Sequence, residues 1–322
     1  MTAPNGQKDR HTVDVKDLKL IIALSKYEHF ARAADACNIS QPAFSTRIRK
    51  LEEELDVPIV ERGHRFGGFT HEGEIVLKWA RRVISNCDGL IQDIDTARNV
   101  LSGEFVIGVV PTALPYVSVI VSRFCDQHPL VKPTIISMSS QAIQRGLDDY
   151  SLHAAITYLE NEPLTGILGT HLYNESYVFV ASSPLIEENI TDITWEEASK
   201  YPLCLLTPNM QNRRIINNIF DKLDISPSIK IETNSFAVIL GHVTTGKYAS
   251  ILPLLYLSSY GMLDELHYVH LEEPELYQSV GLIIADRDPI LPITKEFLHS
   301  TEEFLKKQTI PTISDQLSHC IT

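Results

Sequence analysis

The stretch from residue 39 to residue 55 constrains this chain most, because it reads as one capped helix with two different faces. Ser40 is a good N-cap, and Pro42 falls in the first turn, where a missing N–H costs little. Apolar side chains recur at helical spacing at Phe44, Ile48, Leu51 and Leu55. The pattern predicts a helix that packs one face against a small core and leaves the other face free for a partner.

The free face carries polar side chains that can reach base edges and phosphates from within a DNA major groove. The candidate DNA contacts on this helix are Ser40, Gln41, Pro42, Ser45, Thr46, Arg47, Arg49 and Lys50. Arg32, in the segment before it, joins them. Residues 32–50 contain four cations and one anion, so the segment forms a locally positive patch.

The flanking segments predict a winged helix-turn-helix. A short helical pattern over residues 30–36 comes first, and a tight turn at 37–39 separates it from the helix above. Asp14 can cap an earlier helix over residues 15–24. Residues 57–70 are rich in turn and β formers, and Arg62 and Arg65 there are placed to contact phosphate. We expect this DNA-binding domain at 13–73, after a polar tail at 1–12.

These motifs resemble the N-terminal domain of the LysR-type transcriptional regulators. The matching pieces are Phe30-x-Arg32-Ala33-Ala34, Ser40-Gln41-Pro42-Ala43-x-Ser45, Ile48-x-x-Leu51-Glu52-x-x-Leu55, Glu61-Arg62 and Thr70-x-x-Gly73. The chain departs from the family at Thr46-Arg47, where many members read Arg-Gln, and at His29, where a small cap is usual. The resemblance implies a sequence-specific regulator that binds double-stranded DNA, with RNA polymerase as a further candidate partner. The departure at Thr46-Arg47 leaves the base preference open.

Residues 74–102 read as one long linker helix with an apolar heptad seam. The seam consists of Val76, Ala80, Val83, Cys87, Leu90, Ile94, Ala97 and Leu101. A helix of roughly 40 Å with such a stripe needs a partner, which is either a second copy of the chain or the chain's own core. The resemblance implies a homodimer through this helix, and a homotetramer through the C-terminal domains.

The rest of the chain alternates strands and helices, starting with a strand at 104–110 and a helix at 114–126. Gly103-Glu104-Phe105-x-Ile107-Gly108 with Pro111-Thr112, and the segment 245–253, resemble the LysR effector-binding domain. The resemblance implies an α/β multidomain protein with a two-subdomain effector domain of the type 2 periplasmic-binding-protein-like fold at 103–310. We place subdomain one at 103–180 and 268–310, subdomain two at 181–267, crossing strands at 177–181 and 261–269, and a tail at 311–322.

A ligand in such a fold should lie at the carboxyl ends of the strands, where helix N-termini aim free N–H groups into the cleft. The candidate effector contacts are Thr112, Ala113, Ser139, Ser140, Gln141, Asn209, Gln211, Asn212, Arg213, Thr233 and Asn234. Hydroxyls, amides and a guanidinium favour a small anion. For Ser139, Ser140, Thr233 and Asn234, helix capping alone is an equal alternative. Arg213 and its neighbour Arg214 cannot face the same way, so one of them is a surface or ion-paired arginine.

The five cysteines show no Cys-x-x-Cys pair and indicate neither a disulfide framework nor a metal site. Peroxide-sensing LysR members have two cysteines near the start of the first helix of subdomain two, and this chain has no such pair. Cys204 falls on a predicted buried strand, so we expect it to pack in a core. A switch by oxidation of Cys204, Met210 or Cys87 stays open as an alternative to a ligand.

Enzymatic and transport functions find little support. The chain has no Gly-rich phosphate loop, Gly-x-Ser-x-Gly elbow or His-Glu-x-x-His motif, and we expect no catalytic residue, metal or cofactor. A transport solute-binding protein would need a secretion signal and no winged helix. The polar N-terminus lacks an apolar signal core, and Pro111 and Pro115 break the longest apolar run, so we expect a cytoplasmic protein without membrane attachment.

The acidity of the chain does not argue against DNA binding. The net charge is −13, but the first hundred residues carry 15 Lys and Arg against 15 Asp and Glu. The whole excess of negative charge therefore falls in the C-terminal part, away from the positive patch. The 322 residues and 44% hydrophobic content suffice for two or three domains with their own cores.

Overall fold

A computed structural model describes residues 13–61, 66–98, 100–160, 162, 164–187, 189–259 and 266–307. The chain divides near residue 99 into two compact units. In the part described, no helix is long and apolar enough to cross a membrane.

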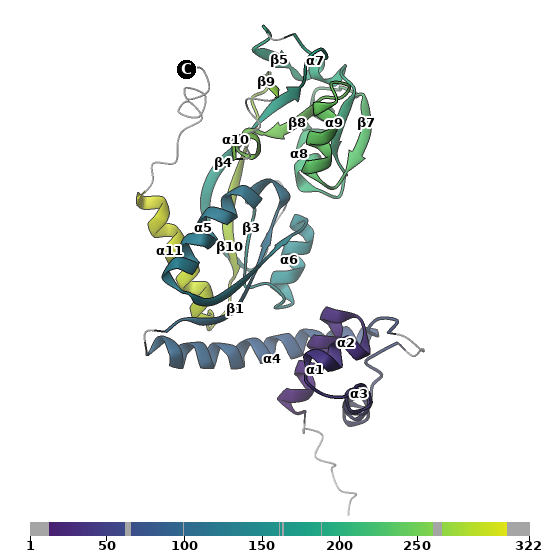
Figure 1. Ribbon diagram of the computed structural model, residues 1–322, viewed down its shortest axis with the longest axis vertical. Helices are drawn as coiled ribbons and strands as arrows, with labels where there is room; N and C mark the ends of the chain where they lie inside the picture. The colour runs from purple at the N-terminus through teal and green to yellow at the C-terminus, as the bar shows by residue number, and fades with distance from the viewer. Residues whose placement is uncertain are drawn as a thin grey trace, which may run out of the picture. The chain divides into compact units, whose positions relative to one another are not determined.

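The N-terminal unit is built on four helices (Figure 1). They are α1 (Val15–Tyr27), α2 (Phe30–Ala36), α3 (Gln41–Leu55) and α4 (His71–Thr96). Side-chain oxygens cap three of them: Asp14 accepts from the N–H of Lys16, Ser40 from that of Ala43, and Thr70 from that of Gly73. Their apolar faces form one core that includes Ile21, Leu24, Ala34, Phe44, Ile48, Leu51, Ile59, Leu77 and Ala80.

A wing follows α3, held by an antiparallel bridge between Val60 and Phe69. Glu52 fastens the base of this wing to α3, because its Oε1 accepts the N–H groups of Ile59 at 2.7 Å and Val60 at 3.1 Å. Gly68 has a φ of 123°, a backbone conformation that favours glycine. The predicted phosphate contacts Arg62 and Arg65 lie outside the described residues.

The linker helix α4 is shorter at its C-terminal end than the sequence predicted. It runs for 26 residues and ends at Thr96, with Ala97 as its C-cap. That length corresponds to about 39 Å at about 1.5 Å per residue. Leu101 was therefore wrongly assigned to the seam, since it lies past the helix end and packs against the core of the C-terminal unit.

The seam on α4 divides into two parts. Ala80 is fully buried, and Val76 and Val83 pack against the core of the same unit. This half therefore follows the alternative in which the stripe covers the chain's own core. Further along, Leu90 is 64% exposed and Ile94 47% exposed. Only this second half of the stripe is left without a cover.

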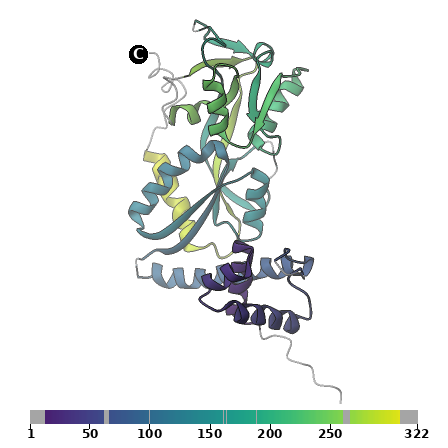
Figure 2. The same ribbon diagram turned by 45° about the vertical axis from the view of Figure 1, so that its right-hand side comes forward.

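The C-terminal unit begins with subdomain one, which contains the first five strands, in the order β2-β1-β3-β10-β4, of an eight-stranded sheet that continues through β4 into subdomain two. Its strands are β1 (Ser102–Val109), β2 (Leu130–Ser137), β3 (Ala154–Tyr158), β10 (Tyr277–Ala285) and the first part of β4 (Ile167–Ala181). β1 is parallel to β2 and β3, whereas β10 is antiparallel to β3 and β4. Helices α5 (Leu114–Gln127) and α11 (Pro292–Lys307) cover one face, and α6 (Ser140–Asp148) covers the other (Figures 1 and 2).

Aromatic rings fill the face under α5 and α11. The ring of Phe105 on β1 lies 5.9 Å from that of Phe124 and 4.9 Å from that of Phe297, centroid to centroid. On the opposite face, Gly108 leaves room for α6 and the segment after it, because a Cβ there would lie 3.2 Å from Cγ1 of Ile143 on α6 and 2.6 Å from a methyl carbon of Leu152. The Ile-Gly pair in the family motif thus has a packing cause.

Subdomain two uses the second part of β4, which pairs with β8 (Ser250–Pro253) and β9 (His267–Glu272). β5 (Asp192–Thr194) lies parallel to β9, and β6 (Leu203–Leu206) is parallel to β7 (Ile229–Thr233). The helices are α7 (Trp195–Ser199), α8 (Gln211–Lys222), α9 (Phe236–Thr244) and α10 (Leu254–Ser259). The parallel pair β6 and β7 ends where α8 and α9 begin.

The crossing between subdomains differs in place from the prediction. β4 passes from one subdomain to the other without a break, pairing with β10 along its first part and with β8 and β9 along its second. The chain returns between β9 and β10. Because β9 pairs with β5 and with residues 178–181, it belongs to subdomain two, and a return at residue 268 was too early.

Candidate functional site

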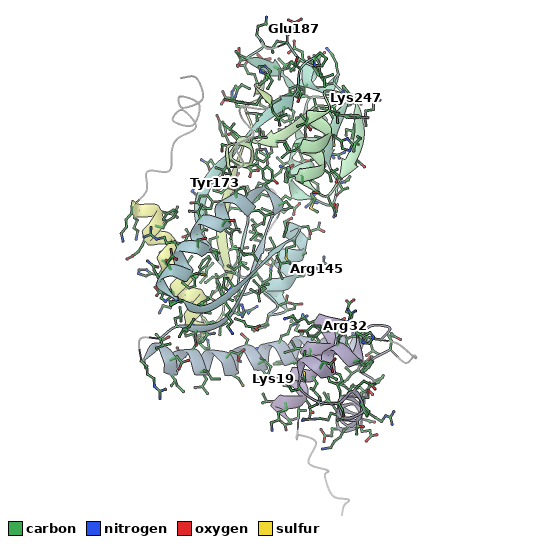
Figure 3. The ribbon with its side chains drawn as sticks, in the orientation of Figure 1. Lys19, Arg32, Arg145, Tyr173, Glu187 and Lys247 are labelled. Atoms are coloured by element: carbon green, nitrogen blue, oxygen red, sulfur yellow. The ribbon has the colours of Figure 1, made fainter. Side chains whose placement is uncertain are left out.

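The exposed face of α3 presents a row of polar side chains. Gln41, Thr46, Arg49 and Lys50 are exposed, and Ser45 is half-buried. The Nε2 of Gln41 donates to Ser45 Oγ at 3.1 Å, one turn along the helix. The predicted contacts Ser40 and Pro42 form the exposed start of this helix. Arg32 is exposed on α2, in the same unit (Figure 3).

Arg47 has a different role from the one predicted. Its Nε lies 2.6 Å from Asp17 Oδ1, and a terminal nitrogen lies 3.8 Å from Asp14 Oδ2. Both carboxylates belong to the start of α1, so this guanidinium fastens α3 to α1 and does not share the free face with Arg49. No local pattern could have predicted this pairing, because the two acids lie about thirty residues earlier.

In the C-terminal unit, five polar side chains meet where the subdomains join. They are Thr112 in the short helix η1 (Pro111–Ala113), Tyr158 at the end of β3, Glu175 and Tyr177 on β4, and Asn212 on α8. We call them the inter-subdomain cluster. Thr112 and Tyr158 follow the carboxyl ends of parallel strands of subdomain one, which is where ligands of open α/β sheets bind.

The cluster is a closed hydrogen-bond network. Glu175 Oε1 accepts from the hydroxyls of Tyr158 and Tyr177, each at 2.7 Å. The Tyr158 hydroxyl lies 3.0 Å from Thr112 Oγ1. Asn212 Nδ2 donates to the Tyr177 hydroxyl at 3.2 Å. These bonds connect α8 of subdomain two to the sheet of subdomain one. The network can therefore form only when the two subdomains are close together.

Glu175 is fully buried, and desolvation raises its pKa to about 7 although hydrogen bonds from Tyr158, Tyr177 and Thr112 act in the opposite direction. Burial likewise raises the pKa of Tyr158 and Tyr177 well above the ordinary value, and the adjacent carboxyl adds to that shift. Such a perturbed carboxyl where two subdomains join marks a functional-site candidate.

A second set of contacts, which we call the clasp, joins the subdomains through Arg214, Glu162 and Ser140. Arg214 Nε donates to Glu162 Oε1 at 2.6 Å, and Ser140 Oγ donates to Glu162 Oε2 at 2.7 Å. Arg214 also donates to Ser140 Oγ at 3.3 Å. Next to the clasp, Gln211 Nε2 donates to the carbonyl of Glu160 at 3.1 Å. A hollow of about 260 Å³ beside it is lined by Glu162, Gln211, Arg214, Ile215, Asn217, Asn218 and Asp221.

The structure brings four of the predicted effector contacts to this junction: Thr112, Ser140, Gln211 and Asn212. Ser139 Oγ accepts from the backbone N–H of Ala142, which is the capping role left open. Thr233 Oγ1 accepts from the backbone N–H of Ser235 in the turn before α9, and Ser235 is the N-cap of that helix. Ala113 is buried in the hydrophobic core. Gln141, Asn209 and Asn234 are exposed.

The prediction that Arg213 contacts the ligand was wrong, because its side chain points into subdomain two. Its side chain is 5% exposed and donates to the carbonyl of Leu206 and, at 2.8 Å, to Glu232 Oε1. It therefore stabilises α8 against β6 and β7 inside subdomain two. The neighbouring Arg214 points into the clasp instead, as the helical rotation between consecutive residues requires.

Several residues of the site were missed in the sequence: Tyr158, Glu162, Glu175, Tyr177 and Arg214. One signal was present, since Tyr173, Glu175 and Tyr177 alternate with period two and so share a strand face. Glu162 had no such signal in the sequence, because its partner Arg214 lies on a helix 52 residues later.

The described residues offer no metal site, since no three His, Cys, Asp or Glu side chains gather there. Three of the described thiols are not activated. Cys204 is fully buried on β6, and desolvation raises its pKa to about 11. Burial also raises the pKa of Cys37 and Cys125.

Two family models match the chain. The LysR substrate binding domain matches residues 98–306, and the bacterial regulatory helix-turn-helix protein of the lysR family matches residues 15–74. This chain belongs to the LysR family of transcriptional regulators. Its two units are therefore the helix-turn-helix domain and the effector-binding domain of such a regulator.

Known LysR regulators align along most of the chain. The dual regulator OxyR of Escherichia coli strain K12 is 26% identical over 294 residues, covering 86% of this chain and 91% of OxyR. A solved full-length OxyR variant from Pseudomonas aeruginosa superposes with a TM-score of 0.71 at 22% identity, covering 91% and 95% of the two chains. CbnR in complex with its target DNA gives a TM-score of 0.64 at 18% identity, covering 90% and 99%.

Proposed function

We propose that this LysR-type regulator reads a specific double-stranded DNA site with Gln41, Ser45 and Thr46 and holds the phosphates with Arg32, Arg49 and Lys50. The exposed polar face of α3 carries this proposal, since these side chains are available on a helix whose other face is buried in its own core. The wing arginines Arg62 and Arg65 complete the phosphate contacts. We place this activity in the cytoplasm, where promoter DNA lies.

We propose a homodimer through the exposed second half of the α4 seam, at Leu90 and Ile94, and a homotetramer through the effector domains. Both leave two or more helix-turn-helix units available for paired half-sites on one face of the DNA. RNA polymerase is the partner through which such a complex acts on transcription.

The activity is tuned by a small molecule with an anionic group, bound between the effector subdomains. The clasp carries this part of the proposal. Arg214 and Ser140 hold the carboxylate of Glu162 between the subdomains, and a ligand carboxylate has the same charge and geometry. An effector that displaces Glu162 changes the closure of the cleft, and with it the packing between protomers and the bend of the DNA.

The DNA-reading role is tested by selecting binding sites from random DNA with the full chain, and then measuring affinity for the selected site and for unrelated DNA. Gln41→Ala should weaken binding to the selected site by about 1–3 kcal/mol and leave unrelated DNA unchanged. Equal losses on both DNAs would contradict base reading by Gln41.

The effector site is tested by thermal melting of the full chain against small carboxylates and inorganic oxyanions. A bound compound at about a hundred times its dissociation constant should stabilise the chain by roughly 2.7 kcal/mol. Arg214→Gln should abolish that gain, whereas Arg145→Gln, on the exposed part of α6, is the matched control and should retain it. Retention by the Arg214 variant would refute the placement.

A further inference from the structure

Three tyrosines adjoin the buried carboxyl of Glu175, and a fourth packs against one of them. Tyr173 and Tyr177 share its face of β4, and Tyr158 donates to it from β3. Tyr116 on α5 adds a fourth ring, with its centroid 4.9 Å from that of Tyr173. Tyr173 lies where the two lobes of the effector-binding domain meet (Figure 3). We call these four tyrosines and Glu175 the acidic cage.

The cage holds polar atoms that the protein does not satisfy. Glu175 Oε2 and the hydroxyls of Tyr116 and Tyr173 are each buried without a hydrogen-bond partner in the described part of the chain. The same holds for Gln211 Oε1, beside the cluster. Buried polar atoms without partners are uncommon, and each costs free energy. Several together indicate that a bound group completes the site.

The missing group is a hydrogen-bond donor with positive charge. Among the described residues, none forms an ion pair with Glu175, so the protein offers no cation to balance this carboxyl in its ionised form. An unpaired buried carboxylate is unfavourable, and a cation is the partner that removes the cost. The faces of aromatic rings attract cations as well, and tyrosines with a carboxylate make a cage for ammonium groups.

We infer that the effector carries an ammonium group, held by Glu175 among the four tyrosines, in addition to the anionic group held by Arg214 and Ser140. This inference rests on the proposed function, because it assigns the second end of the same ligand. Tyr158 of the cage and Glu162 of the clasp are four residues apart at the end of β3, so at most about 14 Å of extended chain separates them. A molecule that carries both groups must reach across that gap. The subdomains must part to admit it.

The test is a melting screen of the full chain in which the probes form matched sets. Each set contains an amino acid, the hydroxy acid that replaces its ammonium group by a hydroxyl, and the amine that lacks its carboxylate. The inference expects at least one amino acid to raise the melting temperature clearly, with its hydroxy acid binding at least tenfold more weakly. Equal effects of the amino acid and the hydroxy acid, or no response to any amine-bearing probe, would overturn it.

Two variants separate charge from packing. Glu175→Gln keeps the shape and an acceptor oxygen, and should weaken the responding amino acid at least tenfold while leaving its hydroxy acid unchanged. Tyr173→Phe keeps the ring and removes the hydroxyl, and should weaken the same probe less. Unchanged binding of the amino acid by the Glu175 variant would refute the inference, and melting of each variant without probe verifies its fold.

Calorimetry supplies a measurement that would not change if Glu175 had only a structural role. When an ammonium group binds beside a protonated Glu175, the carboxyl loses its proton to the buffer. Titrating the responding amino acid at pH 6 in two buffers of different ionisation enthalpy should therefore show proton release in the wild-type chain and none in Glu175→Gln. Absence of release in the wild type would count against ionisation of Glu175.

The outcomes also distinguish this inference from the proposed function. If carboxylates without an amine stabilise the chain and alter DNA binding through Arg214, the proposed effector site stands and the acidic cage is only structural. If no small molecule of any class changes melting or DNA binding, both fail.

Discussion

At the residue scale, two arginines on one helix show how position decides the role of a charge. Arg47 and Arg49 are two residues apart on α3, which turns their side chains by about 200° relative to each other. Arg47 meets Asp17 on α1, while Arg49 is exposed. Composition alone counts both as part of one positive patch, yet only one of them is available to phosphate.

Arg49→Ala should therefore weaken binding to all DNA and reduce the slope of log affinity against log salt by about 1. Arg47→Ala should instead lower the free energy of unfolding of the helix-turn-helix unit by about 1 kcal/mol, because the Asp17 pair is partly buried. Anisotropy titrations at a series of salt concentrations measure the effect on DNA binding. Urea unfolding measures the effect on stability. An undiminished salt slope for Arg49→Ala would contradict its contact with phosphate.

Glu175 makes the free energy of unfolding depend on pH, and the sign of this dependence follows from its raised pKa. Its pKa is about 7 in the folded chain against an ordinary 4.5, so the folded chain binds this proton more tightly than the unfolded chain does. The contribution of Glu175 to stability is therefore fully present below about pH 4.5 and is lost as the pH rises through about 7, by about 3 kcal/mol in total.

Glu175→Gln removes this loss, since glutamine has no proton to release. In urea unfolding, the variant should match the wild type near pH 5 and exceed it near pH 8 by up to about 3 kcal/mol. Glu187→Gln, at an exposed position, is the control and should leave the pH profile unchanged. A Glu175 variant with the wild-type profile would mean that this carboxyl does not titrate between pH 5 and 8.

At the element scale, the exposed end of α4 predicts where protomers meet. Leu90 and Ile94 lie one turn apart on the same stripe and are largely exposed. Burying such a side chain contributes about 1.5–3 kcal/mol, and a twofold dimer buries each of them twice. Leu90→Gln with Ile94→Gln should therefore raise the dimer dissociation constant by at least about a hundredfold.

Sedimentation equilibrium of the full chain measures that change. The matched control is Ile91→Gln, which removes an equally exposed apolar side chain one residue away from the seam. Comparable weakening by the control would show that the dimer uses another face of α4.

The elements also show what sequence reasoning could and could not reach. Periodicity and caps located α3 and most strands, because those signals are local. The seam was read as one continuous stripe, yet packing of Ala80 in the core of its own unit is a tertiary contact that spacing cannot reveal. For the same reason β4 was predicted from residue 177 and in fact begins at Ile167, where pairing with β10 and not hydrophobic alternation extends it.

The residues of the site also divide into those that local sequence signals could predict and those that depend on tertiary contacts. The carboxyl ends of strands and the start of α8 were predictable from topology, which placed Thr112, Gln211 and Asn212 near the junction. The choice between Arg213 and Arg214 depended on the rotation of α8, and the partners Glu162 and Glu175 come from distant segments. Pairings of that kind are decided by the fold as a whole.

At the scale of the whole molecule, the question is what moves the subdomains: a ligand or oxidation of a thiol. Relatives of this chain include hydrogen peroxide-inducible activators, such as that of Dickeya chrysanthemi. The three described thiols whose pKa is raised by burial, Cys37, Cys125 and Cys204, do not suit that chemistry. A thiol with a pKa of about 11, as at Cys204, is ionised to only about one part in ten thousand at pH 7.

Met210, the other sulfur-containing side chain considered as an oxidation sensor, is also partly shielded from solvent. Met210, the N-cap of α8, is half-buried and packs against the core of subdomain two. Oxidation there would make this side chain polar and disturb the packing of subdomain two. Both observations favour a switch in which a molecule alters the clasp and the inter-subdomain cluster, since these groups already join the subdomains by polar contacts that a ligand can replace.

We therefore expect that peroxide at concentrations sufficient to oxidise a low-pKa thiol leaves the affinity for the selected DNA site within twofold of the reduced protein. Anisotropy titration of the full chain measures this, and Cys320→Ser serves as a control because that residue lies outside the described part. A peroxide response that persists in Cys320→Ser and disappears in Cys204→Ser would establish the thiol switch. In that case the subdomains would have to open far enough in solution to expose β6, and the role assigned to Arg214 and Glu175 would pass from sensing to packing.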